Sequence, residues 1–388
     1  MNSSESIVTA TFSRKLITAA AIGAAILGAT VIVSPDRAWA NLLLMSYYLI
    51  TLGLGGALVL ALTNVCGASW NVGFRRVPEA LTGLLPVGGV LLLTALAIRL
   101  PDYGWHHHGE GGAGTFWFKE IWLTPSFFAF RAVTYVLLWI ILSRIMVGNS
   151  RRQDVHSEKI NARINTRVSV LFLAVFAITI SLAGIDWIMA LEPMWFSTMW
   201  GVYQFSGVIQ STLAAVIIAC ILLRRWGPLA GGFTDEHLHD LGKLLLGFSC
   251  FWMYIWFSQY MLIWYSNIPE ETSYYIVRLQ GPWMPVVVSA LVLNWIIPFF
   301  VLLPRVCKRS ETIMLRVAVV VLIGRWVDLG VMIFPPVTGA TPLFGLPELA
   351  SMLTLCSLGS WLFLRSFSGV APVPDNDPYL SESLHYHA

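Results

Sequence analysis

Six charged residues lie within or at the edges of long apolar segments, where an ionisable side chain needs a structural or chemical reason. They are Arg131, Asp186, Glu192, Arg325, Asp328 and Glu348. A charge at the centre of a bilayer costs at least about 2.5 kcal/mol, and such groups commonly mark ion or proton pathways. Carboxylates can exchange protons, and neighbouring guanidinium groups set their charge. The residue types therefore indicate a proton path towards one side of the membrane.

The spacing of four of these residues predicts two ion pairs. Arg325 and Asp328 are three residues apart, so they share one face of a helix. Arg131 lies in the outer half of one apolar segment, and Asp186 lies at the outer end of the next, antiparallel segment. Two interpretations stay open: the pairs fix helix packing without chemistry, or they form a proton relay or a quinone-facing polar pocket.

The other two acids lie at segment edges. Glu348 follows Pro347 in a predicted helix first turn, where the helix dipole favours a carboxylate. A capping role therefore competes with a role in the relay. Glu192 is expected just beyond the membrane, facing water or a periplasmic subunit.

The composition indicates which elements must position these side chains. Of the 388 residues, 57% are hydrophobic and 12% are charged, whereas soluble chains carry about 25% charged residues. Segments of about 20 apolar residues cross a bilayer as helices. We therefore predict an all-α membrane protein, a single integral membrane domain over 1–388 with ten transmembrane helices. They lie near residues 16–33, 42–65, 78–98, 124–146, 166–185, 201–223, 242–265, 282–304, 313–334 and 345–366.

The first segment resembles a secretory signal peptide, because Arg14 and Lys15 precede an apolar run and "AWA" follows at 38–40. We interpret it as a transmembrane helix. With the N-terminus in the cytoplasm, most lysines and arginines fall in cytoplasmic loops, as the positive-inside rule requires. Both termini are therefore predicted to be cytoplasmic. The polar tail 367–388 is expected to be an extended arm that is free or lies on a neighbour.

Two of the predicted helices end alike, which suggests an internal repeat. In "ISLAGIDWIMALEP" Asp186 stands seven residues before Pro193, and in "IGRWVDLGVMIFPP" Asp328 stands seven before Pro335. Four helices separate the two motifs, so the repeat is parallel, a plan known in transporters. It predicts four-helix bundles over 42–185 and 201–334, flanked by the helices 16–33 and 345–366.

Several site types are not supported by the residue pattern. The five cysteines are scattered with no close pair, so a zinc or iron–sulfur site is not expected. No histidine lies in an apolar segment, so the axial ligands of a transmembrane haem are missing. The run His106–His108 is expected in a solvated or partner-facing loop. A net charge of +3 gives no reason to expect nucleic acid.

Two segments carry a resemblance to a known family. "GIDWIMALEPMWFSTMWGVYQFSG" (184–207) and "FWMYIWFSQYMLIWYSNIPEETSYY" (251–275), with the ten-helix plan, resemble the NrfD/PsrC-like membrane subunits. The chain looks in particular like the second of the two ten-span subunits of bacterial alternative complex III. That resemblance implies a place in the bacterial cytoplasmic (inner) membrane, in a complex that oxidises quinol and reduces a periplasmic cytochrome c or blue-copper protein.

The resemblance also implies partners and cofactors. The expected partners are a paralogous ten-span subunit, an iron–sulfur subunit, multihaem and monohaem cytochrome c subunits, small membrane-anchored subunits and lipids. Haem and iron–sulfur clusters would belong to those partners. This chain is expected to bind no redox cofactor of its own, with quinone or menaquinone as the one small molecule it could meet.

Three functions follow as alternatives. The first is a non-catalytic subunit that scaffolds a quinol-oxidising complex and provides a proton path. The second is a direct quinol-binding subunit, with Asp186 or Asp328 accepting the quinol proton, which requires hydrogen-bond reach to that proton. The third, suggested only by the repeat, is an independent proton-coupled transporter.

Overall fold

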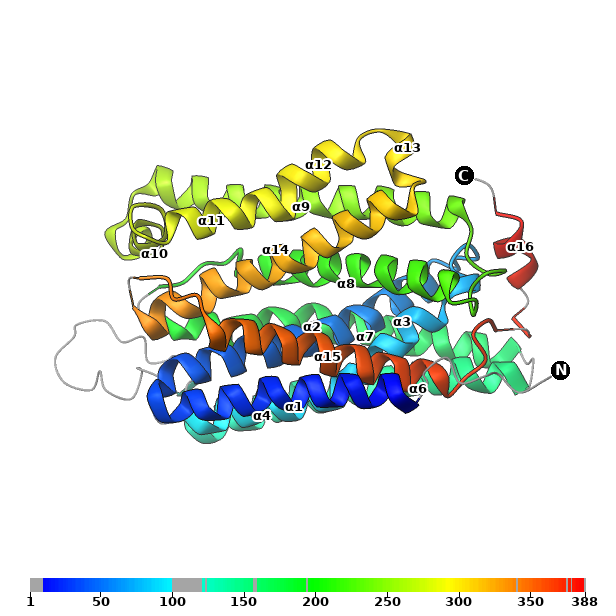
Figure 1. The fold of residues 1–388 in the computed structure, drawn as a ribbon, viewed down its shortest axis with the longest axis horizontal. Coiled ribbons are helices and arrows are strands. Elements are labelled where there is room, and N and C mark those ends of the chain that lie inside the picture. Colours follow the sequence, from blue (N-terminus) through cyan, green and yellow to red (C-terminus); the bar gives the residue numbers. More distant parts are fainter. Residues whose placement is uncertain are drawn as a thin grey trace.

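The structure confirms that the protein is all-α. The computed structural model describes residues 10–99, 121–122, 124–155, 159–192, 195–339, 341–374, 376–377 and 379–386, and this part of the chain contains helices and no strand (Figure 1). Ten of its helical stretches are long and apolar enough to cross a membrane. Each overlaps one of the ten predicted segments.

The helices that form these stretches follow the chain in order, and two stretches are composite. They are α1 (Ala10–Val33), α2 (Pro35–Val65), α3 with η2 and α4 (Arg76–Leu81, Thr82–Leu84, Leu85–Arg99), α6 (Pro125–Val155), α7 (Lys159–Trp187), α8 (Trp200–Arg225), α9 (Asp235–Ser266), α11 with η5 and α12 (Met284–Leu291, Val292–Ile296, Ile297–Leu302), α14 (Glu311–Thr338) and α15 (Leu346–Ser368). Shorter helices are η1 (Val72–Phe74), η4 (Met189–Leu191), α10 (Pro269–Leu279), α13 (Arg305–Lys308) and α16 (Leu380–Leu384).

Several helices extend past their predicted ends because polar turns continue them, and α9 shows how. Thr234 caps its start: the Thr234 hydroxyl accepts from the backbone N–H of His237, and His237 Nδ1 accepts from the backbone N–H of Thr234. Asn267, in the left-handed conformation, ends the helix. Its 32 residues span about 48 Å, more than the roughly 30 Å of a hydrocarbon core. The start of α9 therefore projects beyond the apolar layer.

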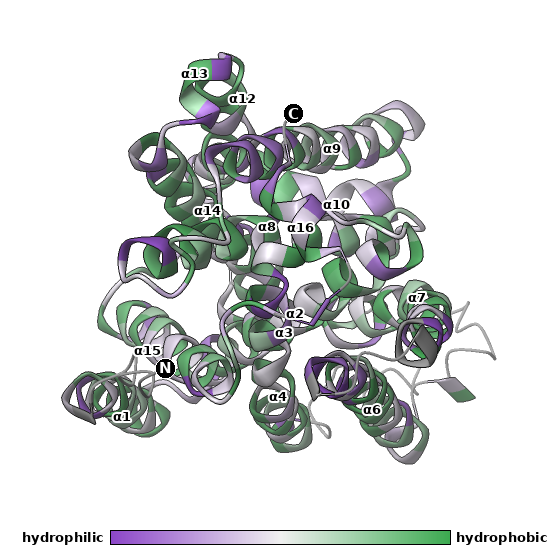
Figure 2. Ribbon diagram, turned by 90° about the vertical axis from the view of Figure 1, so that its right-hand side faces the viewer, coloured by the Kyte–Doolittle hydropathy of each residue, from purple (hydrophilic) through white to green (hydrophobic). Residues whose placement is uncertain are grey.

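The helices pack in two groups of four with a pair on the outside (Figure 2). In the first group α2, α4, α6 and α7 contact one another, and in the second α8, α9, α11–α12 and α14 do so. These are the helices that the repeat assigned to the two bundles. Between the two groups, α2 packs on α14 and α8 packs on α7. The repeat relates these two contacts to each other. The flanking helices α1 and α15 pack on each other and on α2.

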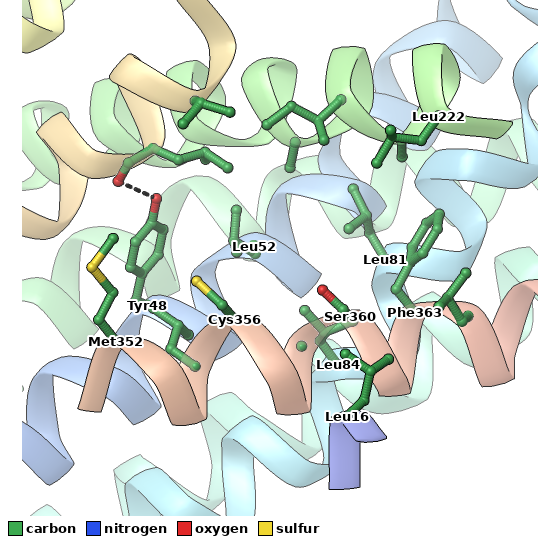
Figure 3. A pocket seen from close by; sticks show the side chains of 18 of the residues that line it. Leu16, Tyr48, Leu52, Leu81, Leu84, Leu222, Met352, Cys356, Ser360 and Phe363 are labelled. Atoms are coloured by element: carbon green, nitrogen blue, oxygen red, sulfur yellow. Dashed lines mark hydrogen bonds between the residues drawn. The ribbon is translucent and has the colours of Figure 1, made fainter. Parts of the chain in front are cut away.

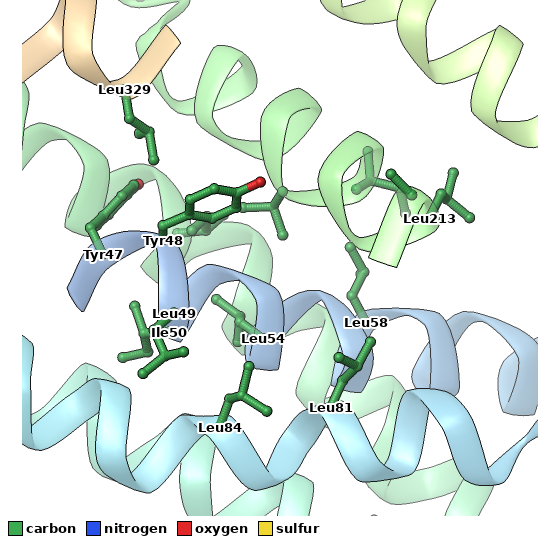
Figure 4. Packing of buried hydrophobic residues seen from close by; sticks show 14 of the residues in the cluster. Tyr47, Tyr48, Leu49, Ile50, Leu54, Leu58, Leu81, Leu84, Leu213 and Leu329 are labelled. Atoms are coloured by element: carbon green, nitrogen blue, oxygen red, sulfur yellow. The ribbon is translucent and has the colours of Figure 1, made fainter. Parts of the chain in front are cut away.

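Helix α2 lies at the centre and is the most enclosed. Its aliphatic and aromatic side chains pack against α3–α4 on one side and α8 and α14 on the other, as Leu54, Leu84 and Leu213 show (Figure 4). Two glycines allow close helix contacts. A Cβ on Gly55 of α2 would lie 1.7 Å from Thr212 Oγ1 of α8, and a Cβ on Gly23 of α1 would lie 2.2 Å from Thr354 Oγ1 of α15. The first segment, with its signal-peptide-like features, is therefore packed into the fold.

The ends of the helices form two faces. The α16 face carries the start of α1 and the helix α16, and the α10 face lies at the opposite end (Figure 1). Arg131, Asp186, Glu192 and Glu348 lie towards the α10 face, close to the ends of α6, α7 and α15, whereas Arg325 and Asp328 lie near the middle of α14. The assignment of the α16 face to the cytoplasm stays a prediction.

The tail differs from the expected extended arm, because it folds back on its own chain at the α16 face. Ser383 Oγ donates to Trp70 O (2.9 Å) and accepts from the backbone N–H of Gly73 (3.0 Å). The Tyr386 hydroxyl donates to Asp240 Oδ2 at 2.6 Å. This hydrogen bond raises the pKa of Tyr386 to about 12, so the phenol keeps its proton at neutral pH. Hydrogen bonds of Ser383 and Tyr386 thus join the tail to both helix groups.

Replacing Ser383 with Val is expected to release this tail. The serine is completely buried, and the substitution leaves the N–H of Gly73 without its acceptor, at a cost of about 1–3 kcal/mol. The population of the open tail should rise about tenfold or more, seen as faster chymotrypsin cleavage after Tyr379. Ser381→Ala, at an exposed position of the same helix, is the control. Equal cleavage rates in the two variants would contradict the assigned role.

Candidate functional site

Asp186 and Arg131 form the first buried ion pair. Arg131 Nε donates to Asp186 Oδ2 at 2.9 Å, and the indole N–H of Trp122 donates to Oδ1 at 2.8 Å. Arg131 also donates to Trp122 O, and its guanidinium lies 4.1 Å from the Trp122 ring centroid. Asp186 is 1% exposed and Arg131 is 5% exposed. Antiparallel α6 and α7 bring the two charges together, as their predicted positions required.

Asp328 is the centre of a second, more extensive cluster. Arg325 Nη1 donates to Asp328 Oδ2 at 2.6 Å from the same helix, and the Tyr203 hydroxyl donates a short hydrogen bond to Oδ1. Arg325 Nη2 donates to Gln204 Oε1 at 3.1 Å, and that oxygen also accepts from the Tyr47 hydroxyl at 3.1 Å. All five side chains are buried. A continuous polar chain therefore joins α2, α8 and α14 through the centre of the protein.

Close backbone packing makes room for this cluster. A Cβ on Gly207 would lie 2.3 Å from Arg325 Nη1, so only glycine on α8 lets the guanidinium reach Gln204. A Cβ on Gly324, the residue before Arg325, would lie 2.9 Å from the Asn294 side chain. Glycine is therefore needed at both contacts, at Gly207 against Arg325 and at Gly324 against Asn294.

A second polar group lies next to this glycine contact. Asn294 belongs to the π-helical segment η5, and its carbonyl accepts from Gln210 Nε2 at 2.6 Å. Gln210 Nε2 also donates to Ser249 Oγ at 3.0 Å. Single-turn π segments are rare and occur frequently at functional sites. Buried polar side chains therefore continue from Arg325 along α8 in the direction of the α16 face.

Glu348 has the capping role that its position suggested, and it also forms an ion pair with Arg37. Glu348 Oε2 accepts from the backbone N–H of Gly345 at 2.9 Å, which caps α15. The same carboxylate accepts two hydrogen bonds from Arg37, at 2.8 and 2.5 Å, and one from Asn41 at 3.0 Å. It is 2% exposed. The acid thus fixes α15 to the start of α2, remote from the Asp328 cluster.

Glu192 was expected to face water or another subunit, and the structure places it in an ion pair instead. Arg278 Nη2 donates to Glu192 Oε1 at 2.6 Å. The arginine also donates to Val331 O and Tyr274 O, and its guanidinium lies 3.6 Å from the Tyr274 ring centroid. Arg278 is 2% exposed. The reason for the correction is that α10 folds over this end of the helices and buries a cation that the sequence assigns to a loop.

The repeat relates Asp186 to Asp328, but the two carboxylates belong to separate clusters and their arginine partners lie at different places in the fold. The arginine partner of Asp186 comes from the neighbouring helix α6, whereas Arg325 and Asp328 lie on one helix. Trp187, which follows Asp186, has its ring centroid 6.4 Å from that of Tyr47 in the second cluster. The predicted residues therefore belong to four distinct charge pairs.

One buried ionic cluster was missed, at the other end of the first helix group. Arg76 Nη1 donates to Glu79 Oε2 at 2.6 Å, and Ser150 Oγ donates to Glu79 Oε1 at 2.5 Å. Arg76 also pairs with Asp154. Glu79 is 1% exposed and Arg76 is 3% exposed. The signal was an i,i+3 spacing between Glu79, at the start of the predicted segment 78–98, and Arg76 just before that segment.

A comparison of the chain with protein-family models and with curated proteins found no match. Within the described ranges, no three His, Cys, Asp or Glu side chains come together as metal ligands. The run His106–His108 and Pro193 lie outside the described residues. The assignment of a function therefore depends on the buried charge clusters and on the resemblance of the two motifs.

Proposed function

We propose that the chain is a membrane subunit of a quinol-oxidising complex of the alternative complex III type. It scaffolds the complex and carries protons through its second helix group, and the redox cofactors belong to partner subunits. The observation that carries the proposal is the buried chain of hydrogen bonds that joins Asp328 to Tyr203, Arg325, Gln204 and Tyr47. The resemblance of segments 184–207 and 251–275 supports the choice of complex.

The geometry favours proton handling at Asp328 over a packing role alone. A buried ion pair is often replaceable by apolar side chains at no cost in stability, so stability is a weak reason for keeping one. This pair also engages a phenol and a carboxamide, and these groups can pass or orient a proton. Gln210, Ser249 and Asn294 extend the polar side chains along the bundle. A path that begins at Asp328 could therefore continue towards the α16 face.

The test is the substitution Asp328→Asn in the intact complex, reconstituted in sealed vesicles. The amide keeps the shape of the side chain but cannot exchange a proton. Proton release per electron is expected to be lost, while the subunits remain assembled. Glu348→Gln is the matched control, because that buried carboxylate pairs with Arg37 at the edge of the fold. If proton release and quinol oxidation are both unchanged in Asp328→Asn, the acid is structural.

Direct quinol binding by Asp186 or Asp328 predicts a different result. In that case quinol oxidation itself falls in the asparagine variants, and a quinone-site inhibitor loses affinity for the complex. The partners are tested separately by purifying the tagged chain in mild detergent and recording a haem spectrum. Cytochrome absorbance and a copurifying iron–sulfur subunit would support the proposed complex. A colourless chain that purifies alone would favour the transporter.

A further inference from the structure

An apolar cleft lies between the flanking helix pair and the second helix group. It has a volume of about 530 Å³ and is lined by side chains of α1, α2, α3, η2, α8, α14 and α15 (Figure 3). Helix α15 packs on α1 and α2, whereas α14 packs on α2 and α8, and the cleft separates α14 from α15. Its size is within the range of about 300–1,000 Å³ that holds small ligands.

The length of the cleft matches one leaflet of a bilayer. Along α15 its lining runs from Met352 to Leu364, which corresponds to about 18 Å at the rise of an α-helix. Half of a hydrocarbon core is about 15 Å. The lining ends at Phe12 and Trp226, whose rings are in edge contact at 6.4 Å between centroids. The cleft therefore spans the leaflet on the α16 side and ends where a headgroup would lie.

The lining provides a surface for hydrocarbon and little for a polar group. Most of its side chains are aliphatic or aromatic, and Leu52, Leu81 and Leu84 face it from one side (Figure 3). The Tyr48 hydroxyl, at the inner end, already donates to Leu322 O at 2.9 Å. An acyl chain can cover such an apolar surface by hydrophobic contact alone, without a hydrogen bond.

Exposed cations without an ion-pair partner in the described part of the chain lie beside the outer end of the cleft, and Lys15 and Arg316 are two of them. Lys15 lies between the lining residues Phe12 and Leu16 on α1, and Arg316 lies one turn before the lining residue Val319 on α14. Both are exposed. In contrast, the nearby Arg225 already pairs with Glu311 at 3.0 Å. The free charge at this opening is therefore positive.

We propose that an anionic phospholipid of the α16-side leaflet binds here, with one acyl chain in the cleft and its phosphate at Lys15 and Arg316. Basic residues near a membrane surface attract anionic headgroups, and an indole such as that of Trp226 suits the headgroup level. The bound chain contacts α14 and α15 together. The lipid thus joins the flanking pair to the second helix group, independently of any proton path.

The test uses the intact complex, purified in mild detergent and incubated with phosphatidylglycerol or phosphatidylcholine before native mass spectrometry. The double variant Lys15→Gln/Arg316→Gln should retain phosphatidylglycerol about tenfold less well than the wild type, since each basic side chain contributes separately. Arg365→Gln is the matched control, because Arg365 is exposed on the same face but stacks over Trp361. Ala219→Phe, which fills the cleft, should abolish retention of the lipid, and Ala177→Phe on the exposed surface of α7 should not.

Three results of the lipid-binding experiment would each overturn the proposal. They are equal retention of the two lipids, retention by the double variant as strong as in the wild type, and retention unaffected by Ala219→Phe. Recovery of a neutral isoprenoid quinone from the cleft would also overturn it. Loss of assembly in Ala219→Phe is checked by the subunit composition in the same spectra, and the charge variants then decide the outcome.

Discussion

Replacing Arg325 with Met is expected to destabilise the folded chain by about 3–5 kcal/mol, because it leaves a buried carboxylate without its cation. Asp328 is 2% exposed, and Arg325 provides its only cationic hydrogen-bond donor among the described residues. The substitution also removes the donor to Gln204, which is one of the hydrogen bonds that join α14 to α8. Thermal unfolding of the purified chain in detergent, followed by tryptophan fluorescence, measures the loss.

A second variant separates the charge from the packing of the arginine. In Arg325→Met/Asp328→Leu the unpaired charge is gone, and most of the lost stability should return, since apolar residues often replace a buried ion pair at little cost. Asp328→Leu alone should cost nearly as much as Arg325→Met, because it leaves a buried guanidinium. If the double variant is as unstable as either single variant, the effect comes from packing against Gly207 and not from the charge.

Replacing Gly55 with Leu is expected to cost about 3 kcal/mol, at the upper end of the range for overpacked cores. Even a Cβ at this position would lie 1.7 Å from Thr212 Oγ1 and 2.7 Å from Thr212 Cβ. Helices α2 and α8 are the central helices of the two groups, and neither can move without disturbing four or more neighbours. The expected result is a lower yield of folded chain in the membrane and a lower unfolding temperature.

The control for this substitution is Gly28→Leu on α1. A Cβ on Gly28 meets nothing within 4 Å, so the same change in helix propensity and volume occurs without a collision. The unfolding temperature of Gly28→Leu should stay close to that of the wild type. Similar losses in both variants would show that the loss of glycine, and not close packing of α2 on α8, determines the result.

Hydropathy was sufficient to predict the ten helices, and the spacing and order of residues added two ion pairs. Twenty apolar residues have one stable way to satisfy their backbone in lipid, so each segment becomes a helix. The pair of Arg325 and Asp328 follows from an i,i+3 spacing within one helix. The pair of Arg131 and Asp186 needed one further step, the antiparallel order of two successive helices. These predictions depend on local geometry, which the sequence contains.

The partners of the remaining acids could not be predicted. Arg37 and Glu348 are 311 positions apart, and Arg278 and Glu192 are 86 positions apart. The positive-inside rule could not reveal these partners, because it concerns the sum of charges on a side and not their contacts. Arg278 lies in helix α10 and is buried, whereas the packing of α15 on α2 encloses Arg37 only in part. The folded tail was missed for the same reason, since its hydrogen bonds reach Trp70 and Asp240.

The amino-acid order of this protein thus decides which segments enter an apolar layer, since that depends on the composition of about twenty consecutive residues. The tertiary structure alone decides which charges meet, where the cleft opens between α14 and α15, and which glycines permit close contact. The physical reason is range. Hydrophobic transfer is a property of each segment and adds up along the chain, whereas an ion pair requires two side chains within a few ångströms, wherever they lie in the sequence.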